Sequence, residues 1–159
     1  MNLNTSLNLM PKLRKAFTLI ELLVVIGVLA ILLTIVLIAI NPARQFSLSN
    51  NTKRRSDANA ILNAIDQYAA DKKGVLPAGI DVTVRTIGSA VGDANICVAL
   101  VSDYLAALPA DPLTNNGSPV TNCAAAYSTN YTVVRSATNN RITIAAPAAE
   151  LSEVISITR

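Results

Sequence analysis

The stretch FTLIELLVVIGVLAILLTIVLIAI, residues 17–40, decides the architecture of this chain. Glu21 is its one charged residue, and no charge occurs over residues 22–40. As a helix rising about 1.5 Å per residue, this uncharged run spans roughly 30 Å, the thickness of the hydrocarbon core of a bilayer. We therefore predict a membrane-spanning helix over residues 17–40. A carboxylate beside such a run is costly to hold in lipid, which marks Glu21 as functional.

The charge imbalance of the 159-residue chain lies just before this helix. The chain has 13 basic residues, 10 acidic residues and no His. Three of the basic residues, Lys12, Arg14 and Lys15, lie in a short leader without any acid, so the rest of the chain is balanced. The net charge of +3 therefore gives no ground for nucleic-acid binding. The lack of His removes the commonest general base and metal ligand.

The apolar stretch indicates a retained anchor rather than a removed secretory signal. A secretory signal has about 7–15 apolar residues and an A-x-A-like cleavage site, and no such site follows Ile40. Basic residues lie on both sides of the span, so the positive-inside count is close to a tie. The compact leader cluster favours an N-terminus in the cytoplasm, and a candidate disulfide between Cys97 and Cys123 favours an exported C-terminal part.

Helical periodicity continues beyond the apolar stretch. Pro42 lacks an N–H and its ring crowds the carbonyl of Ile38, which predicts a kink or a local break there, a full stop being the alternative. Gly74 is suited to end the helix. We expect one long helix, kinked at Pro42, from Phe17 to about Lys73. Its second half, residues 41–73, has one apolar face, formed by Ala58, Ile61, Leu62, Ile65, Tyr68 and Ala69.

Residues 74–159 predict a small globular β-rich head. Tyr104, Tyr127 and Tyr131 are expected to pack in its core. Alternating apolar residues and polar turns predict strands over 80–87, 127–135, 141–146 and 154–158, and a short helix or turn within 94–108. The predicted fold class is α+β, with a long N-terminal helix packed on a small antiparallel β-sheet head.

The head has two cysteines and no catalytic constellation. Cys97 and Cys123 are too far apart for a CxxC redox or zinc pair. Outside the cytoplasm they predict one disulfide, and two buried thiols are the alternative. Ser residues have no His partner and no Gly-rich phosphate loop occurs. We expect no cofactor and no enzymatic activity.

Two polar clusters are open to more than one interpretation. Residues 53–55, Lys-Arg-Arg, could bind lipid headgroups, an acidic neighbour or DNA, but we expect a solvated helix face. Asp103, Asp111, Asn115 and Asn116 could offer oxygen ligands to Ca²⁺. They lack EF-hand spacing and suit turns, so we expect no metal site.

Residues 15–22, Lys-Ala-Phe-Thr-Leu-Ile-Glu-Leu, closely resemble the class III signal of type IV pilins and type II secretion pseudopilins. The resemblance covers roughly residues 12–40, and the helix-then-sheet order that follows is also similar to a pilin. It implies that a prepilin peptidase cuts between Ala16 and Phe17, removes residues 1–16, and methylates the new amine of Phe17. Ala16 stands where the family usually has Gly.

The resemblance also implies a role for Glu21 in assembly. Its carboxylate would neutralise the Phe17 amine of a neighbouring subunit in a dry fibre core, where a buried ion is tolerable when paired. Such a staggered contact does not close on itself and therefore propagates into a filament. The alternative is that Glu21 merely lies in the headgroup region.

The partners implied are the prepilin peptidase/methyltransferase, identical and related pilin subunits, the pilus assembly platform, and membrane lipid before assembly. DNA or surfaces are the candidate ligands of the filament. The chain would be a single-pass cytoplasmic membrane protein before assembly and part of an extracellular filament afterwards. Two alternatives to a pilus subunit are a pseudopilin of a type II secretion system and a signal-anchored membrane protein that never polymerises.

Overall fold

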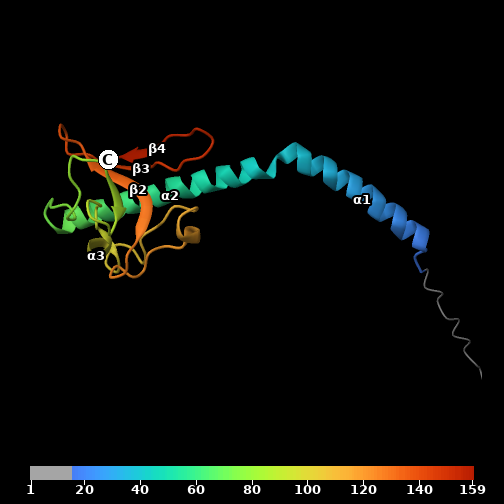
Figure 1. Cartoon of the computed structure of the whole chain (residues 1–159), viewed down its shortest axis with the longest axis horizontal. Helices are drawn as coiled ribbons and strands as arrows, with labels where there is room; N and C mark the ends of the chain where they lie inside the picture. Colours follow the sequence, from blue (N-terminus) through green and yellow to red (C-terminus); the bar gives the residue numbers. More distant parts are fainter. Residues whose placement is uncertain (1–15) are drawn as a thin grey trace, which may run out of the picture. The chain divides into compact units, whose positions relative to one another are not determined.

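The computed structural model describes residues 16–159, and residues 1–15 of the predicted leader lie outside this range. The chain divides into two compact units at the boundary between Asn41 and Pro42. The first unit contains one helix, α1 (Leu19–Ile40). The second unit contains α2 (Pro42–Asp71), β1 (Arg85–Gly88), α3 (Cys97–Leu100), a 3-10 turn η1 (Asn115–Gly117), β2 (Ser128–Arg135), β3 (Ile142–Ala146) and β4 (Ile155–Thr158) (Figure 1).

The second unit is built on one antiparallel sheet with strands in the order β1-β2-β3-β4. Val133 of β2 pairs with Ile144 of β3, which pairs in turn with Ile157 of β4. Buried and half-buried residues alternate along β3, so one face of the sheet is apolar. Helix α2 packs against β3 and β4 (Figure 1). The predicted α+β fold with its antiparallel meander is confirmed.

The core of this unit lies between the inner face of α2 and the sheet. The predicted apolar face of α2 supplies Ala58, Ile61, Leu62 and Ile65, all of which are fully buried. Tyr131 is buried as expected, whereas Tyr104 and Tyr127 are only partly buried against the core. The other buried apolar residues of the sheet and loops include Ile87, Ile96, Leu100, Leu108, Val133, Ile142, Ile144, Ala146 and Ile155.

The region predicted as one long helix consists of two helices. Asn41 follows α1 with φ 43° and ψ 79°, a left-handed conformation that Asn adopts more readily than most residues. Pro42 is the first residue of α2, where its missing N–H costs no helical hydrogen bond. The backbone interruption therefore lies at Asn41, and a kink at Pro42 stays a prediction. At the other end, Gly74 has φ 89° and its N–H donates to the carbonyl of Ala69 at 2.7 Å.

Strand β1 is shorter than the strand predicted over 80–87. Asp81 forms a local turn instead, because its carboxylate accepts a hydrogen bond from the Thr83 N–H at 2.8 Å. Arg85 then donates from Nε and Nη2 to the same carboxylate, at 3.0 and 2.7 Å. Side-chain bonds to neighbouring backbone compete with strand pairing, and here they delay the strand to Arg85.

Cys97 and Cys123 form a disulfide with their Cα atoms 5.5 Å apart. Cys97 begins α3 and is fully buried in the core, while Cys123 lies in the loop before β2. The bond therefore joins the loop between η1 and β2 to the core of the head.

We predict that Cys97→Ser/Cys123→Ser lowers the unfolding free energy of the head by roughly 3–4 kcal/mol, because it frees a long loop in the unfolded chain. The measurement is urea unfolding of the full chain in detergent, followed by circular dichroism. Reducing the wild-type protein should cause a similar loss, whereas reductant should leave the double variant unchanged. Leader cleavage should not be affected, and an unchanged unfolding midpoint would contradict a stabilising disulfide.

Candidate processing and assembly segment

The predicted cleavage site lies on exposed, non-helical backbone. Residues 16–18 precede the first helical residue, Leu19, and Thr18 has φ −80° and ψ 152°, an extended conformation. The Phe17 side chain is 89% exposed. The bond between Ala16 and Phe17 is therefore accessible on a segment that no secondary structure protects.

A capping box fixes the start of α1. The Thr18 hydroxyl oxygen accepts a hydrogen bond from the Glu21 N–H at 3.2 Å. In return, Glu21 Oε2 accepts from the Thr18 N–H and from the Thr18 hydroxyl, each at 2.9 Å. These bonds satisfy backbone donors that the first turn of a helix leaves unpaired. Sequence reasoning missed Thr18, although the spacing Thr-x-x-Glu before an apolar run is the signature of this cap.

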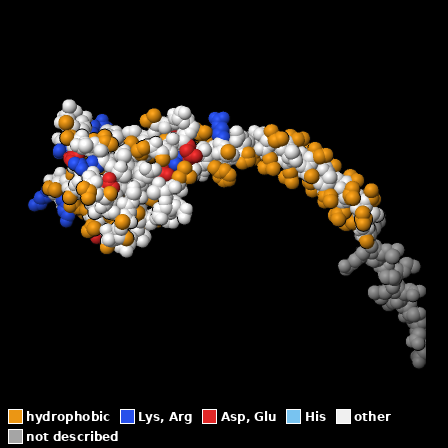
Figure 2. Space-filling view, in the orientation of Figure 1, with side chains coloured by type: hydrophobic (Ala, Val, Ile, Leu, Met, Phe, Trp, Pro, Cys, Tyr) orange, Lys and Arg blue, Asp and Glu red, His pale blue; other side chains and the backbone are white. Residues whose placement is uncertain are grey.

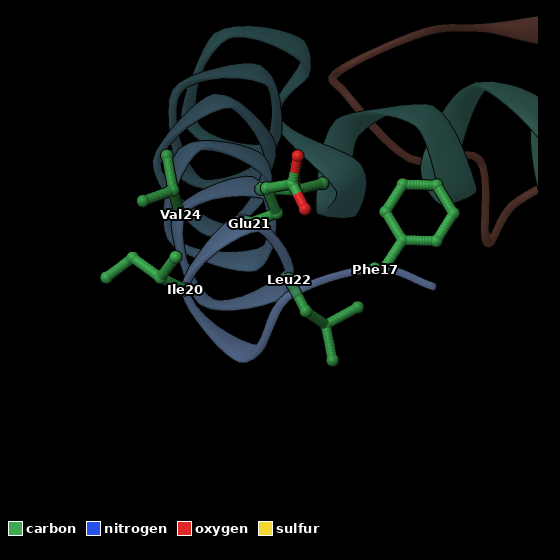
Figure 3. A pocket seen from close by; sticks show the side chains of 6 residues that line it. Phe17, Ile20, Glu21, Leu22 and Val24 are labelled. Atoms are coloured by element: carbon green, nitrogen blue, oxygen red, sulfur yellow. The ribbon is translucent and has the colours of Figure 1, made fainter. Parts of the chain in front are cut away.

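The capping box holds the Glu21 carboxylate among apolar side chains at the tip of α1. Figure 3 shows Ile20 and Val24 on one side of the helix and Phe17 on the other, with the carboxylate between them. Glu21 is the only charged residue within α1. A single anion is thus placed four residues after the backbone nitrogen that cleavage before Phe17 would expose.

The rest of α1 offers an uncovered apolar surface. None of its residues is buried, and hydrophobic side chains cover it along its length (Figure 2). Its large apolar side chains range from 49% exposed at Ile40 to 81% at Leu19. Thr34, inside the helix, donates its hydroxyl to the Ala30 carbonyl at 2.8 Å and so needs no outside partner. Such a surface is stable only in lipid or against other apolar helices.

Among the described residues, α1 is the helix that is long and apolar enough to span a membrane. Residues 11–37 match the family model of the prokaryotic N-terminal methylation motif. The chain carries the class III signal of type IV pilins and pseudopilins. The matched range includes Ala16, Phe17 and Glu21. Neither a curated protein nor a solved structure matches the chain.

In the pilin-like head, the cluster at residues 53–55 is only in part the solvated helix face that we expected. Arg54 is fully buried, and its Nε and Nη2 donate to the Asp111 carboxylate at 2.6 and 3.2 Å. Asp111 is also fully buried. Lys53 and Arg55, on either side, are exposed and pair with Asp57 and Glu153. The expectation of a solvated face holds for Lys53 and Arg55 but was wrong for Arg54, because Arg54 lies four residues before Ala58 and shares its buried helix face.

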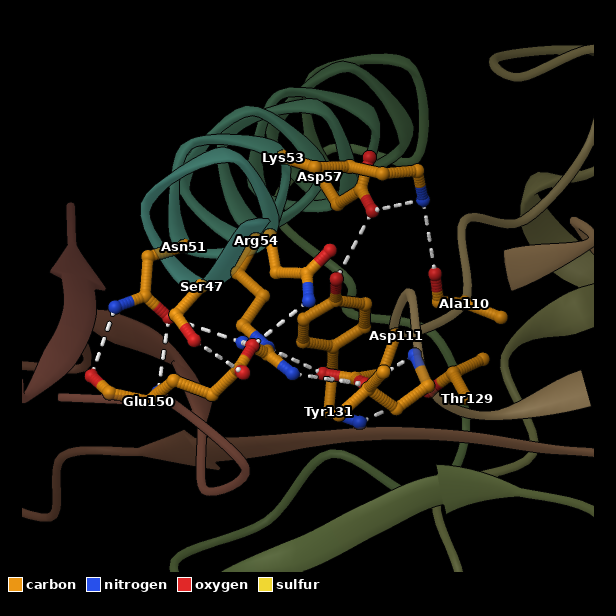
Figure 4. Close-up of polar contacts among 12 residues, drawn as sticks. Ser47, Asn51, Lys53, Arg54, Asp57, Ala110, Asp111, Thr129, Tyr131 and Glu150 are labelled. Carbon is orange, nitrogen blue, oxygen red and sulfur yellow. Dashed lines mark hydrogen bonds and ion pairs between the residues drawn. The ribbon is translucent and has the colours of Figure 1, made fainter. Parts of the chain in front are cut away.

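A second carboxylate completes what we call the Arg54 cluster, formed by Arg54, Asp111, Glu150 and Asn51 (Figure 4). Arg54 Nη1 donates to Glu150 Oε2 at 2.7 Å and to Asn51 Oδ1 at 2.9 Å. Asn51 also accepts from the Glu150 N–H and donates to the Glu150 carbonyl, at 2.9 and 2.8 Å. The cluster connects α2 to the loop before η1 and to the loop before β4.

The cluster favours the ionised forms of Arg54 and Glu150. Burial alone would lower the pKa of Arg54, but its bonds to Asp111 and Glu150 outweigh this and raise the pKa above its usual value. Bonds from Arg54, Asn50 and Ser47 lower the pKa of Glu150. Nearby, burial raises the pKa of Tyr131, whose hydroxyl donates to Asp57 at 2.9 Å. The tyrosine is therefore a neutral donor at every physiological pH.

We predict that the head loses stability in acid and that Glu150→Gln weakens this pH dependence. A carboxylate whose folded pKa is lowered stabilises the fold above its unfolded pKa and loses that contribution as the pH falls through the folded value. The loss should begin as the pH falls below the ordinary glutamate value of 4.5. The measurement is the midpoint of urea unfolding of the full chain as a function of pH. Equal acid slopes for the variant and the wild type would contradict the role of Glu150.

The residues considered for Ca²⁺ do not form one group of free ligands. Asp111 is bound to Arg54 and also accepts the Leu113 N–H at 2.9 Å. Asp103, Asn115 and Asn116 are exposed, and both asparagines have positive φ in the η1 turn. No group of three or more His, Cys, Asp or Glu residues suited to a metal occurs within residues 16–159.

Proposed function

We propose that this chain is the structural subunit of a type IV pilus. Prepilin peptidase cuts it between Ala16 and Phe17 and methylates the Phe17 amine. The protein waits in the cytoplasmic membrane with its N-terminus inside and its head outside. The assembly platform then moves it into a helical homopolymer through α1. In this proposal, residues 1–16 are the leader, 17–40 the membrane and assembly helix, 41–73 the amphipathic helix and 74–159 the head.

One observation carries this proposal: the methylation motif at residues 11–37 runs directly into a helix with no buried residue. A helix of this kind needs an apolar environment both before and after assembly. Moving it from lipid to a bundle of identical helices exchanges one apolar environment for another, so hydrophobic burial gives little net drive. Packing and polar pairs must then select the register between subunits.

Glu21 is the residue that we assign to this selection. In the subunit described here its carboxylate binds Thr18 of its own helix. A carboxylate has acceptor sites for several donors, so it can keep this cap and still accept a neighbour's ammonium. Cleavage before Phe17 creates that ammonium in every copy. Pairing Glu21 of one copy with Phe17 of the next would then repeat along the filament.

We predict that mass spectrometry of filaments sheared from cells finds a mature chain beginning at N-methylated Phe17. Its mass should lack residues 1–16 and include one added methyl group. The cell membrane fraction should contain the same mature chain. A chain beginning at Met1, or cut elsewhere, would contradict the assigned site.

The same preparation distinguishes a pilus subunit from a pseudopilin of a secretion system. The methylation motif is common to pilins and pseudopilins, so it does not distinguish them. Long surface filaments composed mainly of this chain support the pilus subunit. Mature, methylated protein that is confined to the cell envelope contradicts it and favours the pseudopilin.

A further inference from the structure

A cavity of about 480 Å³ opens on the head, and none of the residues that line it belongs to the Arg54 cluster. One wall is the loop that follows α2, and the other is the end of β2 with the turn into β3. The residues that line it are Gly74, Val75, Leu76, Ile80, Arg135 and Asn140. The cavity thus combines apolar side chains with a guanidinium and an amide.

Arg135 has an unusual environment in this cavity. Its Nε is buried and has no hydrogen-bond partner. None of the ion pairs found within residues 16–159 involves Arg135. Buried donors are nearly always paired, so an exception calls for an explanation, and a bound ion is one. Arg135 thus lines the cavity with a buried, unpaired Nε and without a carboxylate in ion-pair distance among the described residues.

Asp81, which is bonded to Arg135 through the backbone, does not compensate this charge. The Asp81 carbonyl accepts the Arg135 backbone N–H at 2.8 Å. The Asp81 carboxylate, however, is bound by the Arg85 guanidinium, which lowers the pKa of Asp81, and by the Thr83 N–H. Lys73, next to Gly74 in the sequence, adds a further positive charge. The surroundings of Arg135 are thus suited to an anion from outside the chain.

We propose that this cavity binds a small oxyanion, a carboxylate or a phosphate, through the guanidinium of Arg135. A guanidinium offers a planar set of donors that matches both groups. Asn140 supplies an amide at the same wall. Val75, Leu76 and Ile80 form an apolar side that suits the carbon skeleton of an organic anion. This site is independent of the proposed role in a filament.

The test uses the ¹⁵N-labelled full chain in a non-ionic detergent, titrated with sodium phosphate or sodium acetate at constant ionic strength. The readouts are the NMR signals of the Arg135 Nε–H and of the Gly74 and Asn140 amides. We expect saturable shifts with at least one of the two anions and none with chloride. Saturation by phosphate alone or by acetate alone assigns the ligand class. No saturable shift with either anion overturns the proposal.

Three variants locate the binding. Arg135→Gln should lower the affinity for the anion by about tenfold or more, since hydrogen bonds between charged groups are stronger than those between neutral groups. Arg135→Lys keeps the charge without the planar donors and should lower the affinity for the anion less. Arg141→Gln is the matched control, because Arg141 is exposed in the same turn and its side chain reaches the Thr158 carbonyl. Unchanged affinity in both Arg135 variants, with dispersed amide signals showing a folded head, overturns the assignment.

Discussion

Replacing Glu21 by alanine should nearly abolish sheared filaments while the chain is still processed and inserted in the membrane. In the proposed fibre, this change leaves the Phe17 ammonium of a neighbouring copy buried without a partner. Losing one member of a buried pair costs about 3–5 kcal/mol. For each subunit contact, this cost lowers the association constant by more than about 100-fold. The measurement is the amount of filament per cell, with membrane levels of mature chain as the reference.

Thr18→Ala is the control that separates charge pairing from helix capping. It removes the hydroxyl bonds of the capping box but keeps the carboxylate, so it should cost only about 1 kcal/mol of helix stability. Filament yield in Thr18→Ala should stay close to that of the wild type. Equal failure of the two variants would show that Glu21 acts through the cap alone. Normal assembly of Glu21→Ala would contradict the pairing.

Arg54→Met should lower the unfolding free energy of the head by about 3–5 kcal/mol, because it leaves the carboxylate of Asp111 buried without its cation. Methionine is apolar and fills part of the space, so the loss reports mainly on the unpaired charge. The measurement is urea unfolding of the full chain at neutral pH. Adding Asp111→Leu to this variant should restore part of the stability, since the buried anion is then gone as well.

Arg55→Met is the matched control, because Arg55 is adjacent in sequence and pairs with Glu153 at 2.7 Å at the surface. Its side chain is 51% exposed, and exposed pairs contribute roughly 0–1 kcal/mol. The two arginines should therefore differ by at least about 2 kcal/mol. Equal losses in the two variants would contradict the structural role of Arg54.

The apolar face of α2 and the strands after residue 126 could be predicted from periodicity. Apolar residues recur there at the spacing of a helix or alternate as in a strand. Predictions failed where a side chain had more than one local option. Asp81 binds neighbouring backbone and side chain, and so shortens β1. Such competition depends on single hydrogen bonds, which a hydropathy pattern does not report.

The amino-acid sequence by itself determined the helix at residues 19–40 and the processing motif around Phe17. Both depend on residues close together in the chain, so their order and polarity suffice. Only the tertiary structure decided that Arg54 is buried and paired, because its partners lie 57 and 96 residues away. Only the tertiary structure, too, places Arg135 at a cavity with its Nε unpaired. Whether a charge is paired depends on which loops the fold brings to it, and that is a property of packing rather than of local sequence.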